Sequence, residues 1–193
     1  MKWLKKHVSM MSEKKEKLLI LGHSGSGKTF LFKKLLEKGL RAGVKSTTRP
    51  ARSKEEEGID YYFKSKEEYF KLLNEDKLVT NEVFEVNPVN KEPETWYYGI
   101  TKKEFKESQI FILTTGEFKQ LNLSESERKE CFVVFLDIPR KVRESRLHHR
   151  EDKNDSVKRR LDADEIDFKD FNDYDLKITD PDFGADDIYE LMD

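Results

Sequence analysis

The chain has 193 residues, a length that suits one domain with a sizeable core and attached subdomains. Charged residues make up 39% of the sequence, but the formal net charge is only −2, which argues against a general binder of nucleic acids or membranes. A single cysteine, Cys131, rules out an internal disulfide, and the lack of an apolar stretch as long as a signal peptide or a membrane span predicts a cytoplasmic protein.

The character of the sequence changes at residue 18. Residues 1–17 are polar and rich in lysine, which predicts a flexible amino-terminal extension. The apolar run at residues 18–21 predicts a strand, and the amphipathic pattern that follows Lys28 predicts a helix up to about residue 38. A glycine-rich turn joins the two elements.

This turn matches the phosphate-binding pattern G-x-x-x-x-G-K-[ST] at Gly22, Gly27, Lys28 and Thr29. Glycines let the backbone curl its N–H groups around a phosphate, and the helix that follows adds free N–H donors and the positive end of its dipole. Lys28 is predicted to reach the β- and γ-phosphates of a bound nucleotide, and the Thr29 hydroxyl to coordinate Mg²⁺. The predicted phosphate contacts of the loop come from Gly22, Ser24, Gly25, Ser26, Gly27, Lys28 and Thr29.

Apolar runs and helical patterns alternate along the rest of the chain. Such alternation predicts an α/β fold in which a parallel sheet carries helices on both faces. A basic helical segment at 140–161 is interrupted by polar residues at 151–155. The other predicted elements are short strands at 61–63 and 78–79, a helix at 66–73, a loop at 87–94, strands at 110–113, 132–136 and 176–179, and a last helix at 185–192.

Two arginines in a proline-containing turn form a candidate anion site. Arg49 and Arg52 are three residues apart, and guanidinium groups suit phosphate. Such a pair taken alone is more often a solvated basic turn, so it gains weight only from its place after the phosphate-binding loop.

The ordered set of motifs resembles the guanylate kinase family of P-loop nucleoside monophosphate kinases. The resemblance covers roughly residues 18 to 180, and no motif besides the phosphate loop is specific by itself. The further motifs are T-T-R-x-x-R at 47–52, G-x-D-Y-x-F at 58–63, Y-Y-G at 97–99, R-L-x-x-R at 146–150 and R-L at 160–161.

The resemblance implies a P-loop parallel-sheet core flanked by helices, with an inserted mixed α/β subdomain for the monophosphate and a helical lid. The guanylate-kinase-like domain would span 18–193. Within it, the implied boundaries are a core of 18–44, 100–141 and 163–193, a monophosphate-binding subdomain of 45–99 and a lid of 142–162.

The resemblance also implies roles for individual residues. Arg49, Arg52, Tyr61 and Tyr98 would hold the acceptor phosphate, and each offers a suitable donor. Glu82 would read the base, because a carboxylate accepts hydrogen bonds from guanine N1–H and the 2-amino group together; Glu85 is its competitor for this role.

In the basic segment, Arg146, Arg150 and Arg160 would close over the transferring phosphoryl group and act with Lys28 in catalysis. The remaining cations there, Arg143, Lys153, Lys158 and Arg159, are expected on a solvated helix face. Thr179 would contact the adenine of ATP.

Several positions depart from the family pattern around the acceptor. Lys45 stands where the family usually has a serine, and Ile100 where it has a small hydroxyl residue. The strand at 110–113 is followed by Thr114-Thr115-Gly116 without the family's base-reading aspartate. Because this loss also removes an acidic partner for Mg²⁺, Asp137 and Glu117 become the candidates for that role.

The sequence therefore favours an ATP- and Mg²⁺-dependent kinase that phosphorylates GMP or dGMP, acting as a monomer or homodimer without nucleic-acid or membrane partners. A second hypothesis is the same transfer to another (deoxy)nucleoside monophosphate or a sugar phosphate. A third is a non-catalytic guanylate-kinase-like binding module, disfavoured because Lys28 and the lid arginines are present. A regulatory GTPase is disfavoured further, because no N-K-x-D motif occurs.

Overall fold

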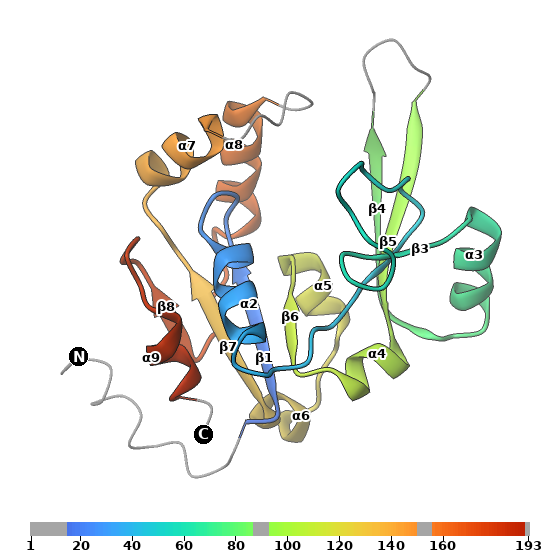
Figure 1. The fold of residues 1–193 in the computed structure, drawn as a ribbon, viewed down its shortest axis with the longest axis horizontal. Helices are drawn as coiled ribbons and strands as arrows, with labels where there is room; N and C mark the ends of the chain where they lie inside the picture. The colour runs from blue at the N-terminus through green and yellow to red at the C-terminus, as the bar shows by residue number, and fades with distance from the viewer. Residues whose placement is uncertain (1–14, 87–92, 150–155, 192–193) are drawn as a thin grey trace.

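The computed structural model describes residues 15–86, 93–149 and 156–191. Its centre is a sheet of four parallel strands in the order β6-β1-β7-β8 (Figure 1). These strands are apolar over nearly their whole length, as expected for a parallel sheet that is covered on both faces. Their bounds are β1 Lys17–Gly22, β6 Ile110–Ile112, β7 Cys131–Leu136 and β8 Leu176–Ile178.

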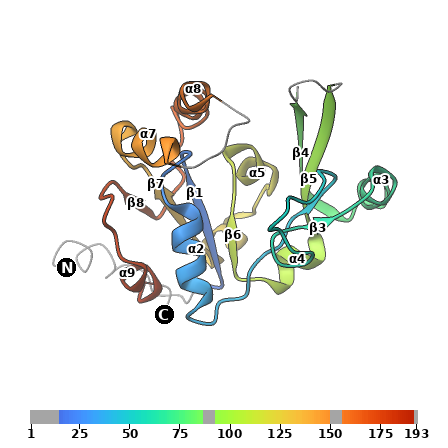
Figure 2. The same ribbon diagram turned by 45° about the horizontal axis from the view of Figure 1, so that its top comes forward.

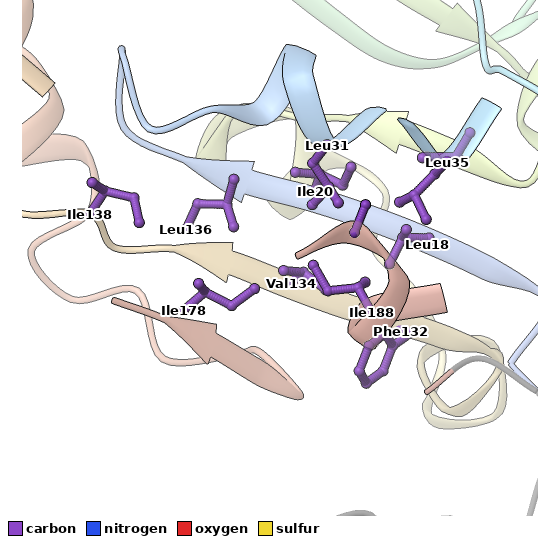
Figure 3. Packing of buried hydrophobic residues seen from close by; sticks show 12 residues of the cluster. Leu18, Ile20, Leu31, Leu35, Phe132, Val134, Leu136, Ile138, Ile178 and Ile188 are labelled. Atoms are coloured by element: carbon purple, nitrogen blue, oxygen red, sulfur yellow. The ribbon is translucent and has the colours of Figure 1, made fainter. Parts of the chain in front are cut away.

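Helices cover both faces of this sheet. On one face α2 (Lys28–Leu36) and α9 (Ala185–Tyr189) pack Leu31, Leu35 and Ile188 onto alternate residues of β1 and β7 (Figure 3). The other face buries Leu19, Leu21 and Val133 beneath aromatic side chains that come from α4, α5 and the segment after α8. The helices on this side are α4 Lys102–Glu107 and α5 Thr115–Gln120, and α6 Glu125–Glu130 leads directly into β7.

A second, mixed sheet lies to one side of the core, beyond α5 (Figures 1 and 2). Its strand order is β3-β2-β5-β4, and its long hairpin is formed by β4 and β5. The bounds of its elements are β2 Ser46–Thr47, β3 Tyr62–Phe63, α3 Lys66–Asn74, β4 Leu78–Val86 and β5 Glu94–Thr101. A capping box between Ser65 and Glu68 begins α3, which buries Tyr69 against this sheet.

Two further helices, α7 (Arg140–His148) and α8 (Val157–Asp167), lie together at the end of the core where β1 and β7 finish (Figure 1). Ion pairs link them, from Arg140 to Asp162 at 2.5 Å and from Arg143 to Glu165 at 2.5 Å. Within the described residues, no helix is long and apolar enough to cross a membrane.

The parallel sheet and its helices agree with the sequence-based expectation, but several bounds differ, and the last helix, predicted over 185–192, ends at Tyr189. Strand β1 begins at Lys17, one residue inside the segment expected to be an extension. The short strand predicted at 78–79 is nine residues long, and Glu94, predicted to end a loop, begins β5. The rest of that loop, residues 87–92, and the interruption at 151–155 lie outside the described residues.

Candidate active site

The phosphate-binding pattern forms the turn between β1 and α2. Gly25 and Gly27 have φ of +76° and +106°, in the left-handed region that favours glycine. A Cβ at Gly25 would also lie 2.8 Å from the carbonyl oxygen of Arg143. The backbone therefore needs glycine here, and its curled N–H groups have the form of an anion cradle.

Lys28, at the start of α2, folds back over this turn. Its ammonium donates hydrogen bonds to the carbonyl oxygens of Gly22 at 2.5 Å and His23 at 2.9 Å. The charge of Lys28 is thus held at the loop itself, where phosphates would be bound. The neighbouring Thr29 is exposed at the same end of the helix.

His23 is a part of the loop that sequence reasoning missed. It is 4% exposed, and its ring contacts Phe168 and Phe135 at centroid distances of 4.7 and 5.6 Å. Burial lowers the pKa of His23, and the nearby Arg143 guanidinium lowers it further. The imidazole is therefore neutral near pH 7 and acts as an aromatic support beneath the loop. His23 occupies a variable position of the phosphate-binding pattern, so the sequence gave no indication that it packs beneath the loop.

The loop also contacts a carboxylate from α8. The Ser24 N–H donates a hydrogen bond to Asp164 Oδ2 at 2.6 Å, and the Ser24 hydroxyl donates to Oδ1 at 3.3 Å. Asp164 thus occupies one anion-binding N–H of the cradle. The sequence showed Asp164 only as one acid among many.

The expectation that Arg143 lies on a solvated face is wrong. Its side chain is 2% exposed and donates to the carbonyl oxygen of Ile138 and to Glu165, with Asp164 at 3.7 Å. Arg143 thus sits beneath the loop and links α7 to α8. Lys158 and Arg159 are exposed, as expected, and Lys153 lies outside the described residues.

Arg146 joins the phosphate-binding loop to the carboxyl end of the chain. Its guanidinium donates to the carbonyl oxygens of Gly25, Ser26 and Pro181. A pocket of about 720 Å³ opens beside it, lined among others by Gly27, Phe30 and Phe183. Sequence reasoning missed both aromatic residues, which show no motif.

The other residues predicted on this side are placed as follows. Thr179 directly follows β8 and is exposed, and it is not among the residues that line the pocket; Pro181 to Phe183 line it instead. Arg160 lies on α8 and is half-buried. Arg150 lies outside the described residues.

The residues predicted to bind the acceptor phosphate lie on the smaller sheet. The guanidinium of Arg49 lies 5.3 Å from the ring centroid of Tyr61 and donates to Glu55 at 2.8 Å. The Tyr61 and Tyr98 rings meet edge to face at 5.8 Å, and burial raises the pKa of both hydroxyls, which therefore remain hydrogen-bond donors at neutral pH. Three of the four predicted phosphate contacts are thus together, whereas Arg52 is exposed nearby.

Glu82 lies on β4 directly opposite Tyr98 of β5. Its carboxylate accepts a hydrogen bond from the Thr114 hydroxyl at 2.6 Å and packs against Gly116, whose Cβ would lie 2.5 Å from Glu82 Oε1. Burial raises the pKa of Glu82. Glu85 is an odd number of residues away on the same strand, so it points to the opposite face, where it is exposed. The geometry therefore favours Glu82 over Glu85 as the base-reading carboxylate.

The two sites share one edge of the molecule. Strands β1 and β6 are parallel neighbours, with Ile20 opposite Ile112, so both end at the same edge of the sheet. The phosphate-binding loop follows β1, and Thr114, the partner of Glu82, follows β6. The carboxyl edge of an open parallel sheet is where ligands bind in this class of fold.

Comparisons with known proteins agree with this geometry. The sequence model of the guanylate kinase family matches residues 14–192. The guanylate kinases of Rickettsia bellii and Rickettsia felis are 29% and 30% identical to this chain, over 90% and 86% of it and 91% and 85% of their own lengths. The crystal structure of guanylate kinase from Anaplasma phagocytophilum superposes with a TM-score of 0.64 at 23% identity, covering 95% of this chain and 87% of that one, which shows a shared fold. The chain therefore belongs to the guanylate kinase family.

Proposed function

We propose that this protein transfers the γ-phosphoryl group of ATP to GMP or dGMP and releases the nucleoside diphosphate. The observation that carries the proposal is the pair of anion sites at one edge of the core sheet: the glycine-rich loop with Lys28, and the Arg49–Tyr61–Tyr98 group beside Glu82. A kinase acting on a monophosphate needs two phosphate sites, whereas a nucleotide hydrolase needs one.

On the donor side, the loop N–H groups from Ser24 to Thr29 would hold the triphosphate, and the pocket beside Phe30 and Phe183 would take the adenine. The described residues offer no cluster of three His, Cys, Asp or Glu side chains for a metal. A site with the Thr29 hydroxyl as its protein ligand fits Mg²⁺, because this ion commonly keeps several waters and binds phosphate oxygens. Mg²⁺ would neutralise charge on the phosphate oxygens, with Thr29 as its protein ligand.

Of the two acids considered as partners for Mg²⁺, Asp137 has the better position. It directly follows β7, whose Leu136 lies opposite Gly22, and it is one-third exposed beside Lys177. Glu117 is instead buried and paired with Lys45. We therefore assign to Asp137 a contact with the hydrated ion.

On the acceptor side, Arg49, Arg52, Tyr61 and Tyr98 would bind the monophosphate and Glu82 would accept from the guanine N–H groups. The attacking oxygen belongs to a phosphate and is already ionised, so no general base is needed. Catalysis then consists of positioning and charge neutralisation by Lys28 and by Arg146, Arg150 and Arg160.

We further propose that residues 45–99 act as the monophosphate-binding subdomain and residues 142–162 as the lid. Closure of the two around the substrates would exclude water, which would otherwise hydrolyse ATP.

A steady-state assay of ADP formation with a panel of monophosphates tests the function. We expect saturable turnover with GMP and dGMP and little with AMP. Saturable turnover with dTMP or a sugar phosphate, and none with GMP, would establish a different acceptor. If no acceptor supports turnover, calorimetric titration with ATP distinguishes a binding module, which would fail to bind it, from a kinase of another acceptor.

A further inference from the structure

A buried ion pair lies where the smaller sheet meets the core, and no role described so far uses it. Lys45 Nζ is 2.6 Å from Glu117 Oε2, and the two side chains are 19% and 1% exposed. Lys45 immediately precedes β2, and Glu117 lies in the first turn of α5. The pair therefore bridges two parts of the chain that are 72 residues apart.

The sheet register shows which way Lys45 faces. Thr47 lies opposite Tyr98, and Tyr98 lies opposite Glu82, so these three side chains share one face of the smaller sheet. Lys45 is two residues before Thr47, and its carbonyl oxygen accepts from the Tyr62 N–H at 2.8 Å, so the extended backbone continues through it. Lys45 and Glu82 therefore project from the same face of the sheet.

That face is covered by the start of α5, which contacts β4 (Figure 2). Glu117 Oε2 accepts from Lys45 and from the Thr114 N–H, and the Thr114 hydroxyl in turn donates to Glu82. A continuous set of hydrogen bonds thus fixes one ammonium and one carboxylate on the same wall of the acceptor site.

Stability alone does not explain this arrangement. Removing a lysine and a glutamate from water costs more than their attraction commonly returns, and apolar side chains of similar size are often as stable. In addition, Glu117 Oε1 is buried and has no hydrogen-bond partner among the described residues. An ion pair held at such a cost, close to the Glu82 carboxylate that is proposed to bind the base, indicates a role in substrate recognition.

We infer that Lys45, oriented by Glu117, is a specificity-determining residue that donates a hydrogen bond to the six-position oxygen of the acceptor purine. An ammonium has three N–H donors, and Glu117 takes one of them. Guanine offers an acceptor oxygen at position six next to the N1–H donor, which matches a lysine beside a glutamate. Adenine reverses both groups, so it would set an amino group against Lys45 and a bare nitrogen against Glu82. This inference rests on the proposed function and deepens it.

The test compares Lys45→Met with the matched control Lys102→Met, using GMP and 6-thio-GMP as acceptors. The two substrates differ only at position six, where sulfur is the weaker hydrogen-bond acceptor. Lys102 is an exposed lysine paired with Asp76 on the surface, so its loss controls for the change in charge. Glu117→Gln serves as a second variant, because glutamine keeps the capping interaction with Thr114 but removes the negative charge that pairs with Lys45.

We expect Lys45→Met to lower kcat/KM for GMP by about 10- to 100-fold, the scale of a lost charge-assisted hydrogen bond. The preference of the wild-type protein for GMP over 6-thio-GMP should largely disappear. The KM for ATP should stay within about twofold of wild type, and Lys102→Met should change none of these values. Glu117→Gln should reduce the same preference to a smaller degree.

An equal loss on both acceptors, or an unchanged preference, would overturn the inference and leave Lys45 a structural role. If thermal melting shows that Lys45→Met is unfolded, Glu117→Gln decides, and an unchanged preference in it is the contrary result. Failure of the wild-type protein to phosphorylate GMP would overturn the proposed function together with this inference. Turnover of GMP with an unchanged preference in Lys45→Met would overturn only the assignment of Lys45.

Discussion

Replacing Asp164 with asparagine should strengthen ATP binding. In the structure the Asp164 carboxylate takes the Ser24 N–H at 2.6 Å, which is one of the donors that would otherwise face a phosphate. ATP must therefore displace a bound anion before it can use the whole cradle. Asparagine is nearly the same size but carries no charge, so it competes less well for the N–H.

The magnitude follows from the kinds of hydrogen bond involved. A bond to a charged acceptor contributes about 1.5–3 kcal/mol, and a neutral one about 0.5–1.5 kcal/mol. The substitution should therefore weaken the hydrogen bond that competes with ATP by about 1–1.5 kcal/mol, which lowers the dissociation constant for ATP by about 5- to 13-fold.

Calorimetric titration of ATP into the wild-type protein and Asp164→Asn measures this difference. The matched control is Glu165→Gln, because Glu165 is the next residue on α8 and also pairs with Arg143, but its contacts in the described part of the chain are with Arg140 and Arg143 and not with the loop. We expect the control to bind ATP within about twofold of wild type. Unchanged or weaker binding by Asp164→Asn would refute the view that this carboxylate competes with phosphate.

Three further substitutions test the site. Lys28→Ala should lower kcat by about 10²- to 10³-fold, as loss of a transition-state donor does. The control Lys33→Ala, on the exposed face of α2, should leave kcat unchanged. Equal kcat values for the two variants would contradict the role of Lys28. Glu82→Gln should lower kcat/KM for GMP by about 10- to 100-fold with little change in the KM for ATP, while Glu85→Gln serves as the control. Because burial raises the pKa of Glu82, the KM for GMP should rise as the pH falls through that raised value, and Glu82→Gln should flatten the profile. Burial lowers the pKa of His23. Below about pH 6.5, the unfolded chain therefore binds a proton that the native state does not bind. The free energy of unfolding should consequently fall as the pH decreases. His23→Phe should remove up to about 1.4 kcal/mol per pH unit of this slope in urea titrations, and an identical slope would show that His23 titrates normally.

The core could be predicted from sequence because its signals are local. The apolar runs of β1 and β7 and the glycine pattern that follows β1 each lie within a few residues, and buried parallel strands read as continuous apolar segments. Cys131 is 2% exposed and free, as its apolar surroundings predicted, and burial raises its pKa to about 11.

The hairpin was harder to predict because its strands are stabilised by pairing with each other. In β4, the polar run from Thr80 to Glu82 interrupts the apolar residues, and Val83 and Phe84 remain exposed, so the segment lacks the signature of a buried strand. Its length follows from the register with β5, which runs from Leu78 opposite Thr101 to Val86 opposite Glu94. Such pairing is not visible in either segment alone.

The candidate site shows the same contrast between local motifs, which can be predicted from sequence, and long-range contacts, which cannot. The loop and the arginine and tyrosine motifs have fixed local spacing, and the structure brings Arg49, Tyr61 and Tyr98 together. The contacts of Asp164 with Ser24 and of Lys45 with Glu117 join residues 140 and 72 positions apart. Sequence reasoning identified Lys45 only as a departure from a pattern, since the partner that gives it a role is set by the fold.

The central claim is that two phosphate sites lie at the same edge of the core sheet, so that a phosphoryl group passes directly between nucleotides. The most direct measurement follows the label from γ-³²P-ATP when the purified protein is incubated with Mg²⁺ and GMP. We predict that the label appears in the β-phosphate of GDP, and that GMP is required for its loss from ATP. Release of the label as inorganic phosphate at the same rate with and without GMP, or no transfer at all, would contradict the account.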